Sequence, residues 1–326
     1  MKIGIIGAGS FGMALGRHLV LNKNDVKIWG YTKEEKDDLN NHRHSKYLPE
    51  ITFPENLKAS NILKEVVEDR DIIIHVTPSK AFKETLKKYK KYIKKQKILI
   101  CSKGFDKKTG KTLEEILTEE LPNIKYGVLS GPSHAEELGK DLETLLVCAS
   151  KDEEVINETV KIFDREKIRI YGSKDVIGVA LGGALKNIIA VAAGIIVGLN
   201  MGDNTLTAVI TRGLVELSRF SEKLGADPKT IYGLSGLGDL IVTTLSEHSR
   251  NRRAGKLIAR GYTKKEIEKE LGMVVEGLDN IEVVYKMSKK LEIETPITDA
   301  VYEVLHGKIK PKEISKMLMT RTNKYE

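Results

Sequence analysis

The sequence predicts an α/β protein in which a doubly wound parallel sheet is followed by an all-helical C-terminal domain. Up to about residue 174, short apolar runs alternate with helix-length amphipathic stretches, and a glycine-rich turn directly follows the first run. From residue 175 onward, apolar residues recur every three to four positions over long segments. We therefore expect two domains, residues 1–174 and 175–326.

The strands and helices can be placed from these two periodicities. Apolar runs predict strands at 2–7, 25–30, 71–77, 97–104, 126–131 and 144–150. Amphipathic stretches between them predict helices at 11–22, 80–95 and 112–120. In the second half, helices are expected at 175–199, 203–224, 251–260, 264–270, 276–290 and 297–306.

Composition indicates a globular protein of the reducing cytoplasm. Hydrophobic residues make up 40% and charged residues 31% of the 326 positions, which is typical of soluble domains. The two cysteines, Cys101 and Cys148, lie far apart within apolar runs and form no disulfide framework. The N-terminal MKIGIIGAGS lacks the long apolar region of a secretory signal.

Two segments could suggest other classes of protein. The run LGGALKNIIAVAAGIIVGLN (181–200) is long enough to cross a membrane, but Lys186, Asn187 and several glycines favour a buried core helix. Residues 83–97 contain eight lysines, which could bind nucleic acid or anionic lipid. Apolar residues at helical spacing instead predict an ordinary amphipathic helix with solvated lysines, so we expect no nucleic-acid partner and no membrane insertion.

The sequence GAGSFG (7–12) predicts a Rossmann-like dinucleotide-binding loop, because a strand precedes it and a helix follows it. Gly7 allows the tight turn, Gly9 lets a pyrophosphate approach the backbone, and Gly12 permits close helix packing. The phosphates would then lie at the positive end of the helix dipole. The expected cofactor is NAD or NADP.

The choice between these cofactors stays open. The acidic residue expected about twenty positions after the loop, which would bind the adenosine ribose, is missing. The second strand ends at Trp29, and Tyr31 and Lys33 follow. Lys33 could bind a 2′-phosphate, whereas Tyr31 could flank the adenosine.

Four further stretches could carry a site, although none decides the function alone. SKG (102–104) and SGPSHAEE (130–137) each follow a strand, where ligands of doubly wound sheets collect. Lys103 is thus either a cation of the ligand cleft or a surface lysine beside a turn glycine. HSRNRRAG (248–255) offers guanidinium groups to a phosphate or begins a basic helix, and GLGDL (236–240) holds Asp239 in a glycine-rich turn.

Together these motifs resemble those of the bacterial NAD(P)-dependent glycerol-3-phosphate dehydrogenases. GAGSFGMALG, SKG, SGPSHAEE, LGGALKN, GDNTLTAVITRGLVEL, GLGDLIVTT, SRNRRAG and VVEG occur in one order along nearly the whole chain. The resemblance implies the reversible reduction of dihydroxyacetone phosphate to sn-glycerol 3-phosphate, a small phosphate ester used for phospholipid synthesis. A homodimer is the default expectation for such an enzyme.

The resemblance also implies a role for individual residues. The catalytic lysine of the family's LKN motif falls on Lys186. The implied substrate-binding residues are Lys103, Gly131, Ser133, Lys186, Asp239, Ser249, Arg250 and Asn251. The implied cofactor contacts, beside the loop glycines, are Ser10, Phe11, Tyr31, Lys103, Ala135, Arg250, Val274 and Glu276.

The chain departs from the family pattern at two positions. His134 replaces a frequent Phe; as the histidine beside a motif it could act as an acid, but it is expected to fill the space of the Phe. Tyr31 replaces a frequent His or Arg, which weakens any case for NADP. No metal site is expected, because the other histidines lack ligand spacing.

A lysine in an apolar segment suits the implied reaction. An ammonium beside the substrate's carbonyl oxygen can stabilise the negative charge that develops there and donate the proton. Such a lysine needs a partner that fixes its direction, and Asp239 is the candidate. Both residues are therefore expected to be catalytic.

Three alternatives remain at this point. A related dehydrogenase of 3-hydroxy acids or sugar-acid phosphates would share the architecture and the lysine. A cofactor-binding regulator without activity would have no reason to keep Lys186 and Asp239. A nucleic-acid binder would have to act through the lysine-rich helix.

Overall fold

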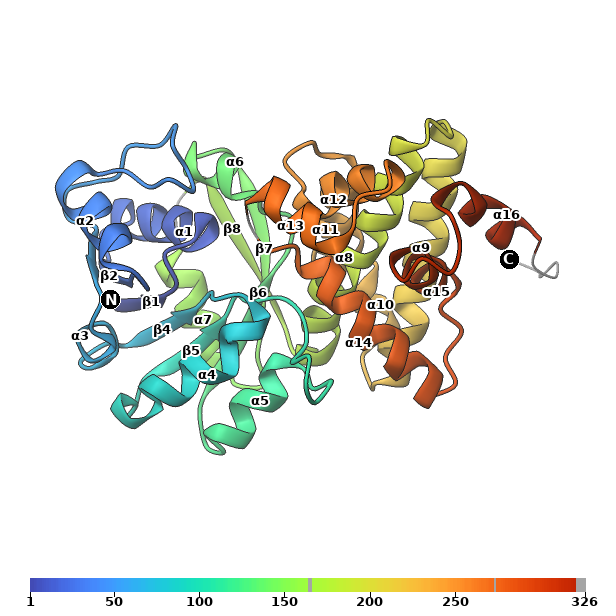
Figure 1. Ribbon diagram of the computed structural model, residues 1–326. Coiled ribbons are helices and arrows are strands. Elements are labelled where there is room, and N and C mark those ends of the chain that lie inside the picture. Colours follow the sequence, from blue (N-terminus) through green and yellow to red (C-terminus); the bar gives the residue numbers. More distant parts are fainter. Residues whose placement is uncertain (164–165, 273, 321–326) are drawn as a thin grey trace. The chain divides into compact units, whose positions relative to one another are not determined.

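The computed structural model describes residues 1–163, 166–272 and 274–320 (Figure 1). It divides the chain into two compact units. The first comprises Met1–Asp106 and Lys111–Ala180, and the second comprises Lys107–Gly110 and Leu181–Glu326. The division falls a few residues beyond the expected boundary, because the first turn of one long helix groups with the first unit.

The first unit is built on an eight-stranded sheet with the order β3-β2-β1-β4-β5-β6-β7-β8 (Figure 1). Its strands are β1 (Lys2–Ile6), β2 (Asp25–Trp29), β3 (Lys58–Ser60), β4 (Ile72–His75), β5 (Lys97–Ile100), β6 (Tyr126–Ser130), β7 (Thr144–Ala149) and β8 (Ile168–Ser173). Neighbouring strands are parallel except for β6 and β7, which pair antiparallel. The α/β class and the mostly parallel sheet are therefore confirmed.

The sheet differs from the prediction in three respects. β3 is only three residues long and β8 is a partly exposed edge strand, so neither gives a continuous apolar run. The antiparallel direction of β7 was also not expected, because a run of apolar residues does not indicate the direction of its strand.

Helices cover the sheet of this unit. They are α1 (Ser10–Leu21), α2 (Lys33–His42), α3 (Leu63–Val67), α4 (Ser79–Tyr89), α5 (Leu113–Glu120), α6 (Ala135–Gly139) and α7 (Glu153–Ile162). The helix expected over 80–95 ends earlier, at Tyr89, and a short 3₁₀ turn follows it. Its apolar residues Phe82, Leu86 and Tyr89 are buried, as the amphipathic pattern predicts.

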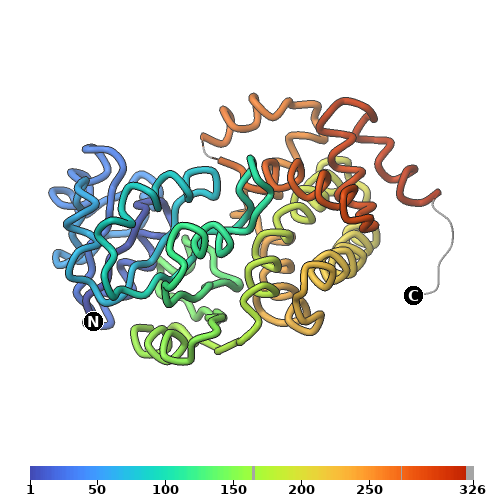
Figure 2. Tube along the Cα trace, turned by 90° about the horizontal axis from the view of Figure 1, so that it is seen from below, coloured from blue at the N-terminus to red at the C-terminus, as the bar shows by residue number. Residues whose placement is uncertain are grey.

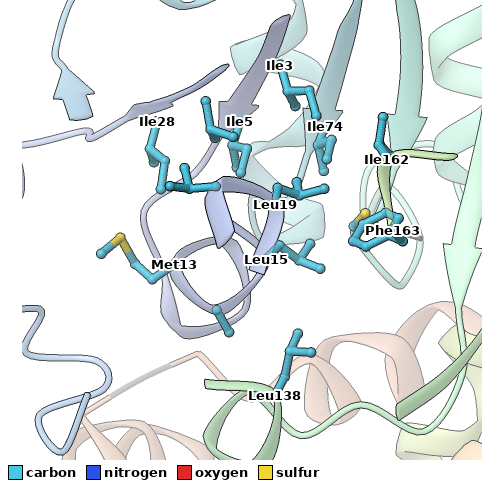
Figure 3. Packing of buried hydrophobic residues seen from close by; sticks show 14 of the residues in the cluster. Ile3, Ile5, Met13, Leu15, Leu19, Ile28, Ile74, Leu138, Ile162 and Phe163 are labelled. Atoms are coloured by element: carbon cyan, nitrogen blue, oxygen red, sulfur yellow. The ribbon is translucent and has the colours of Figure 1, made fainter. Parts of the chain in front are cut away.

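Two apolar clusters hold these helices on the sheet. In one cluster, Leu15 and Leu19 of α1 lie close to Ile3 and Ile5 of β1 (Figure 3). The other cluster includes Phe82 of α4 with residues of β4, β5 and α5. Burial on both faces explains why the central strands read as continuous apolar runs rather than alternating ones.

The cysteines lie inside this unit as free thiols. Cys148 belongs to β7 and Cys101 directly follows β5, and both are buried. Burial raises the pKa of the Cys148 thiol to about 11 and also raises the pKa of Cys101.

The second unit is helical, and the tube in Figure 2 shows it formed by the later part of the chain, coloured from yellow-green to red. Its helices are α8 (Val176–Gly198), α9 (Asp203–Lys223), α10 (Pro228–Ile231), α11 (Asp239–Leu245), α12 (Arg250–Ala259), α13 (Lys264–Leu271), α14 (Glu276–Lys290), α15 (Pro296–Leu305) and α16 (Ile314–Met319). α8 is long and apolar enough to cross a membrane, but 94% of its most apolar window is buried in the protein. It is therefore the core helix that the sequence predicts.

Glycines of α8 let other segments approach its backbone. A Cβ atom at Gly194 would lie 2.1 Å from the carbonyl oxygen of Arg252 in α12. A Cβ atom at Gly182 would lie 2.7 Å from the carbonyl oxygen of Ser235. Any larger residue at either position would force these segments away from α8.

A buried carboxylate joins two further helices of this unit. Glu216 of α9 accepts hydrogen bonds from the backbone N–H groups of Ile297 (2.8 Å) and Thr298 (3.0 Å) and from the hydroxyl of Thr298. It thereby caps the N-terminus of α15, which has no side-chain cap of its own at Thr295. Burial raises the pKa of Glu216 to about 7, and the three hydrogen bonds oppose this shift only in part.

We predict that Glu216→Gln reduces the loss of stability at high pH. Because the folded-state pKa exceeds the usual value of 4.5, the contribution of Glu216 to stability is full below pH 4.5 and is lost as the pH rises through 7. The melting temperature of the variant relative to wild type should therefore rise between about pH 5 and pH 8. The corresponding relative change in the free energy of unfolding is about a few kcal/mol.

Thermal melts at several pH values test this prediction. Glu270→Gln is the matched control, because Glu270 is an exposed carboxylate of the same unit. Parallel pH profiles for wild type and both variants would show that Glu216 does not titrate in this range.

Candidate active site

The glycine-rich loop has the geometry that a dinucleotide requires. Gly7 has a φ of 126°, which only glycine adopts readily, and a Cβ atom at Gly12 would lie 2.1 Å from the carbonyl oxygen of Gly7. A Cβ atom at Gly9 would have no neighbour within 4 Å among the described residues. Packing within the protein therefore does not require a glycine at position 9, whereas the approach of a pyrophosphate does.

The N-terminus of α1 is open to an anion. Its N-cap is Gly9, and in the described structure no side chain caps the helix. Ser10 and Phe11, two of the expected cofactor contacts, form the first turn of this helix. Backbone N–H groups of a first helical turn have no intrahelical partner, so they can bind phosphate oxygens.

The end of β2 holds a carboxylate that the sequence analysis did not expect there. Tyr31 is 73% exposed, and its backbone N–H donates to Glu35 Oε2 over 2.8 Å. Glu35 forms a capping box with Thr32 at the start of α2, which brings its side chain back to the strand end. The pattern Thr32-x-x-Glu35 is the sequence signal that would have located this carboxylate.

The loops after β5 and β6 bring three of the expected substrate residues together. Lys103 Nζ donates to the carbonyl oxygen of Gly131 over 3.4 Å, and the Ser133 hydroxyl donates to the same oxygen over 3.0 Å. Lys103 and Ser133 are half-buried. A cation and a hydroxyl thus lie side by side at the carboxyl ends of two adjacent parallel strands.

Buried polar groups anchor the loop that carries Lys103. Ser102 donates from its hydroxyl to the carbonyl oxygen of Thr77 over 2.6 Å. His75 contacts the Thr77 hydroxyl (2.8 Å) and the Tyr89 hydroxyl (3.0 Å) through its two ring nitrogens. Burial lowers the pKa of His75 to about 3, so the ring is neutral at physiological pH. The sequence motifs do not indicate that His75 and Tyr89 belong to this network.

In the second unit, Lys186 of α8 contacts Asp239 of α11. Lys186 Nζ donates to Asp239 Oδ1 and, over 2.7 Å, to the hydroxyl of Thr243. Lys186 is 7% exposed and Asp239 only 1%. The hydroxyl of Thr243 lies 2.5 Å from the carbonyl oxygen of Asp239, so it can donate there while it accepts from the lysine.

The local fold explains how Asp239 reaches this position. The sequence predicts a turn at Asp239, but the residue is instead the first of α11. It directly follows the π-helical segment Leu234–Gly238. A Cβ atom at Gly236 would lie 2.0 Å from the carbonyl oxygen of Ile231, so the segment can tighten only with glycine there. Thr243 lies four residues after Asp239, and this spacing places both side chains on one helix face. That spacing would have indicated Thr243 from the sequence.

The SRNRR segment forms the start of α12. Ser249 is its N-cap, and its hydroxyl oxygen accepts from the backbone N–H of Arg252 over 3.2 Å. Buried Arg252 pairs with Glu247. Hydrogen bonds from Lys256 and Arg252 lower the pKa of Glu247 to about 2. Arg250 is exposed and has no ion-pair partner in the described part of the chain. The segment thus contains one structural arginine, Arg252, and two exposed arginines, Arg250 and Arg253.

Asn251 connects three helices of the second unit. Its Nδ2 donates to Asn187 Oδ1 over 2.8 Å, and its Oδ1 accepts from the backbone N–H of Gly277 over 3.0 Å. Asn187 follows Lys186 on α8, and Gly277 lies in the first turn of α14. The amide that was expected to bind substrate therefore also fixes α12 and α14 to the helix that carries the lysine.

The remaining expected residues lie as follows. His134 is the half-buried N-cap residue of α6, and buried Ala135 is the first residue of that helix. Val274 and Glu276 are half-buried at the start of α14. Among the described residues, no group of three or more histidine, cysteine or acidic side chains is arranged to hold a metal ion.

Comparison with known proteins gives a consistent family. The N-terminal model of NAD-dependent glycerol-3-phosphate dehydrogenase matches residues 2–156, and the C-terminal model matches residues 175–316. Curated proteins of Bacillus cereus (strain AH187) and Bacillus anthracis (strain CDC 684 / NRRL 3495), both named glycerol-3-phosphate dehydrogenase [NAD(P)+], are 44% identical. In both cases the match covers 100% of this chain and 97% of the relative.

Solved structures agree with this result. The crystal structure of glycerol-3-phosphate dehydrogenase from Coxiella burnetii has a TM-score of 0.95 at 37% identity and covers 98% of this chain and 99% of its own. A structure of glycerol-3-phosphate dehydrogenase from Plasmodium falciparum has a TM-score of 0.90 at 25% identity. The match covers 99% of this chain and 97% of the Plasmodium chain. With the glycine-rich loop and both family models in place, the chain belongs to the NAD(P)-dependent glycerol-3-phosphate dehydrogenases, a family of oxidoreductases.

Proposed function

We propose that the protein reversibly reduces dihydroxyacetone phosphate to sn-glycerol 3-phosphate, with Lys186 as general acid and base. The contact that carries this proposal is the buried one between Lys186, Asp239 and Thr243. A lysine held this firmly in an apolar helix has no evident structural purpose that an apolar residue would not serve better. The names of the curated relatives supply the substrate.

The first unit would hold the cofactor. Gly7, Gly9 and Gly12 would accommodate the pyrophosphate at the start of α1, with Ser10 and Phe11 beside it. Tyr31 would lie on the adenosine side, and Ala135 and Lys103 on the nicotinamide side. When bound, the reduced nicotinamide supplies the hydride that the ketone carbon of the substrate accepts.

Lys186 would donate and accept the proton of the reaction. As the hydride arrives, negative charge develops on the carbonyl oxygen of the substrate, and the ammonium stabilises this charge and donates a proton to it. In the opposite direction, the neutral amine takes the proton of the alcohol. Asp239 and Thr243 fix the direction of Nζ, and the charge of Asp239 keeps the ammonium stable in a buried position.

The phosphate of the substrate would be bound by exposed Arg250, whose planar guanidinium can donate two parallel hydrogen bonds. Ser249 retains its hydroxyl proton as a donor, since only its oxygen is used in capping α12. Lys103, Gly131 and Ser133 form the proposed substrate contacts of the first unit. Asn251, Val274 and Glu276 complete the proposed contacts, with Arg250 shared between substrate and cofactor.

The biological setting follows from the proposed reaction. Glycerol 3-phosphate is the backbone from which glycerophospholipids are made, so the protein would supply phospholipid synthesis in the cytoplasm. The proposed assembly is a homodimer.

The proposed reaction predicts a loss of reduced-nicotinamide absorbance when dihydroxyacetone phosphate is added to the protein with NADH or NADPH. No loss with either cofactor, in a folded protein that binds the cofactor, would remove the substrate assignment. The same assay with 3-keto acids would then test the alternative of a 3-hydroxy-acid dehydrogenase.

We predict that Lys186→Ala lowers kcat by about 10²–10⁴-fold, because the variant lacks the proton donor. Cofactor binding, measured by fluorescence titration, should remain. Because the substitution leaves Asp239 buried without its cation, the double variant Lys186→Ala/Asp239→Asn serves as a second test with a neutral site. If turnover survived in either folded variant, Lys186 would be structural.

We predict that Arg250→Ala lowers kcat/KM for dihydroxyacetone phosphate by an amount equivalent to about 2–4 kcal/mol, because a bidentate contact with the phosphate is lost. Arg253→Ala is the matched control, since Arg253 is exposed on the same helix. Equal kinetics of the two variants would contradict the assignment of Arg250.

A further inference from the structure

A carboxylate, that of Glu35, lies directly beyond the end of β2, where the adenosine ribose of a dinucleotide bound at the GAGSFG loop is expected. Glu35 Oε2 accepts hydrogen bonds from the backbone N–H groups of Tyr31 (2.8 Å) and Thr32 (3.3 Å). Its other oxygen accepts from the hydroxyl of Tyr47 over 3.1 Å. Three donors from two segments of the chain therefore fix this carboxylate directly beyond the end of β2.

The end of β2 lies beside the dinucleotide loop. β1 and β2 are parallel, and Ile6 pairs with Trp29, so Gly7 and Gly30 continue from the same edge of the sheet. A surface hollow lies between the dinucleotide loop and the start of α2. Its lining includes Ala8 and Met13 from the loop and α1, and Glu34, Glu35, Asp38 and Lys46 from the opposite side. A nucleotide whose pyrophosphate lies at Gly9 would direct its adenosine ribose toward this hollow.

The charges in the hollow disfavour a 2′-phosphate. Backbone N–H groups after a strand are typical ligands of such a phosphate, but those of Tyr31 and Thr32 already bind Glu35. Lys46 forms an ion pair with Glu34 (3.6 Å), so its positive charge is shared with Glu34 and does not fully neutralise Glu35. Asp38 adds a third carboxylate, in contact with His44 at 2.9 Å. A ribose hydroxyl can donate to such a carboxylate, whereas a phosphate is repelled by it.

We propose that Glu35 is a specificity-determining residue that makes the protein prefer NADH to NADPH. The inference rests on the proposed placement of the dinucleotide at the GAGSFG loop. In many dinucleotide-binding folds an acidic residue at the end of the second strand binds the ribose. Here the carboxylate of Glu35, the third residue of α2, takes that place. Because three hydrogen bonds fix the Glu35 carboxylate, its negative charge cannot move away from a 2′-phosphate, and the repulsion between them stays strong.

One nearby cation opposes this preference. Lys33 is exposed at the first position of α2, and the described structure gives it no ion-pair partner. Its side chain is long and solvated, whereas Glu35 is held by three hydrogen bonds. A mobile charge in water contributes less than a fixed one, so the effect of Glu35 prevails.

Fluorescence titrations of NADH and NADPH, without substrate, test the inference. Glu35→Gln removes the charge but keeps the capping box, because glutamine serves at this position as well as glutamate does. We expect wild type to bind NADH about ten-fold more tightly than NADPH, and the variant to lose most of this preference through tighter NADPH binding. The preference should also shrink at high salt, because salt screens the repulsion.

Two matched variants separate Glu35 from its neighbours. Glu34→Gln removes a charge one residue away that does not bind the strand end, and it should change the preference less than Glu35→Gln does. Lys33→Gln should leave NADH binding unchanged and reduce NADPH binding only slightly. Thermal melts check that each variant is folded.

Three results would overturn the inference. These are equal or tighter binding of NADPH by wild type, an unchanged preference in Glu35→Gln, and a Lys33→Gln variant that alone loses NADPH. If wild type bound neither nucleotide, the placement of the dinucleotide would fail, and the proposed function would fail with it. Binding of both nucleotides with equal affinity would refute only the role of Glu35.

Discussion

The helical unit is organised around one costly interaction, the buried contact between Lys186 and Asp239. An ammonium and a carboxylate lose most of their hydration at this depth, and only a close, well-directed contact compensates for that loss. The contact requires α8 to lie against the segment that precedes α11. Gly182 permits that approach, since a Cβ atom there would collide with the backbone of Ser235, and Gly236 lets the segment before α11 tighten against Ile231. The lysine therefore depends on positions that carry no chemistry of their own.

The same helix also orients the start of α12, the segment that we propose binds the phosphate of the substrate. Gly194 lets α12 approach α8, and Asn251 bonds to Asn187, the residue next to the lysine. The start of α12, with Arg250, is thus fixed to the helix that carries Lys186. A π-helical segment directly before Asp239 fits this picture, because such segments are frequent at functional sites and rare elsewhere.

Long periodic elements could be predicted closely from the sequence, whereas short and nonlocal features could not. The helix at 276–290 has the predicted bounds, because a sustained apolar stripe outweighs local variation. β3 was missed because three residues carry no period. The meeting of Lys186 with Asp239, 53 residues apart, was inferred from residue type and family resemblance rather than from spacing.

Thr243 and Glu35 were overlooked for a different reason. Both lie on a helix at a spacing that identifies them, four residues after Asp239 and three after Thr32. Their importance arises only when the helix brings them to another segment, Lys186 in one case and the end of β2 in the other. A search for polar pairs at helical spacing beside each motif would have found them both.

The two cysteines have a consequence for the chemistry of the protein in the cell. Peroxides and electrophiles react with the thiolate, and burial keeps both thiols protonated by raising their pKa values, that of Cys148 to about 11. Oxidative stress should therefore leave the folded enzyme chemically unmodified at these positions. For the same reason, a cysteine introduced on the surface would react selectively with a maleimide dye, without replacement of Cys101 or Cys148.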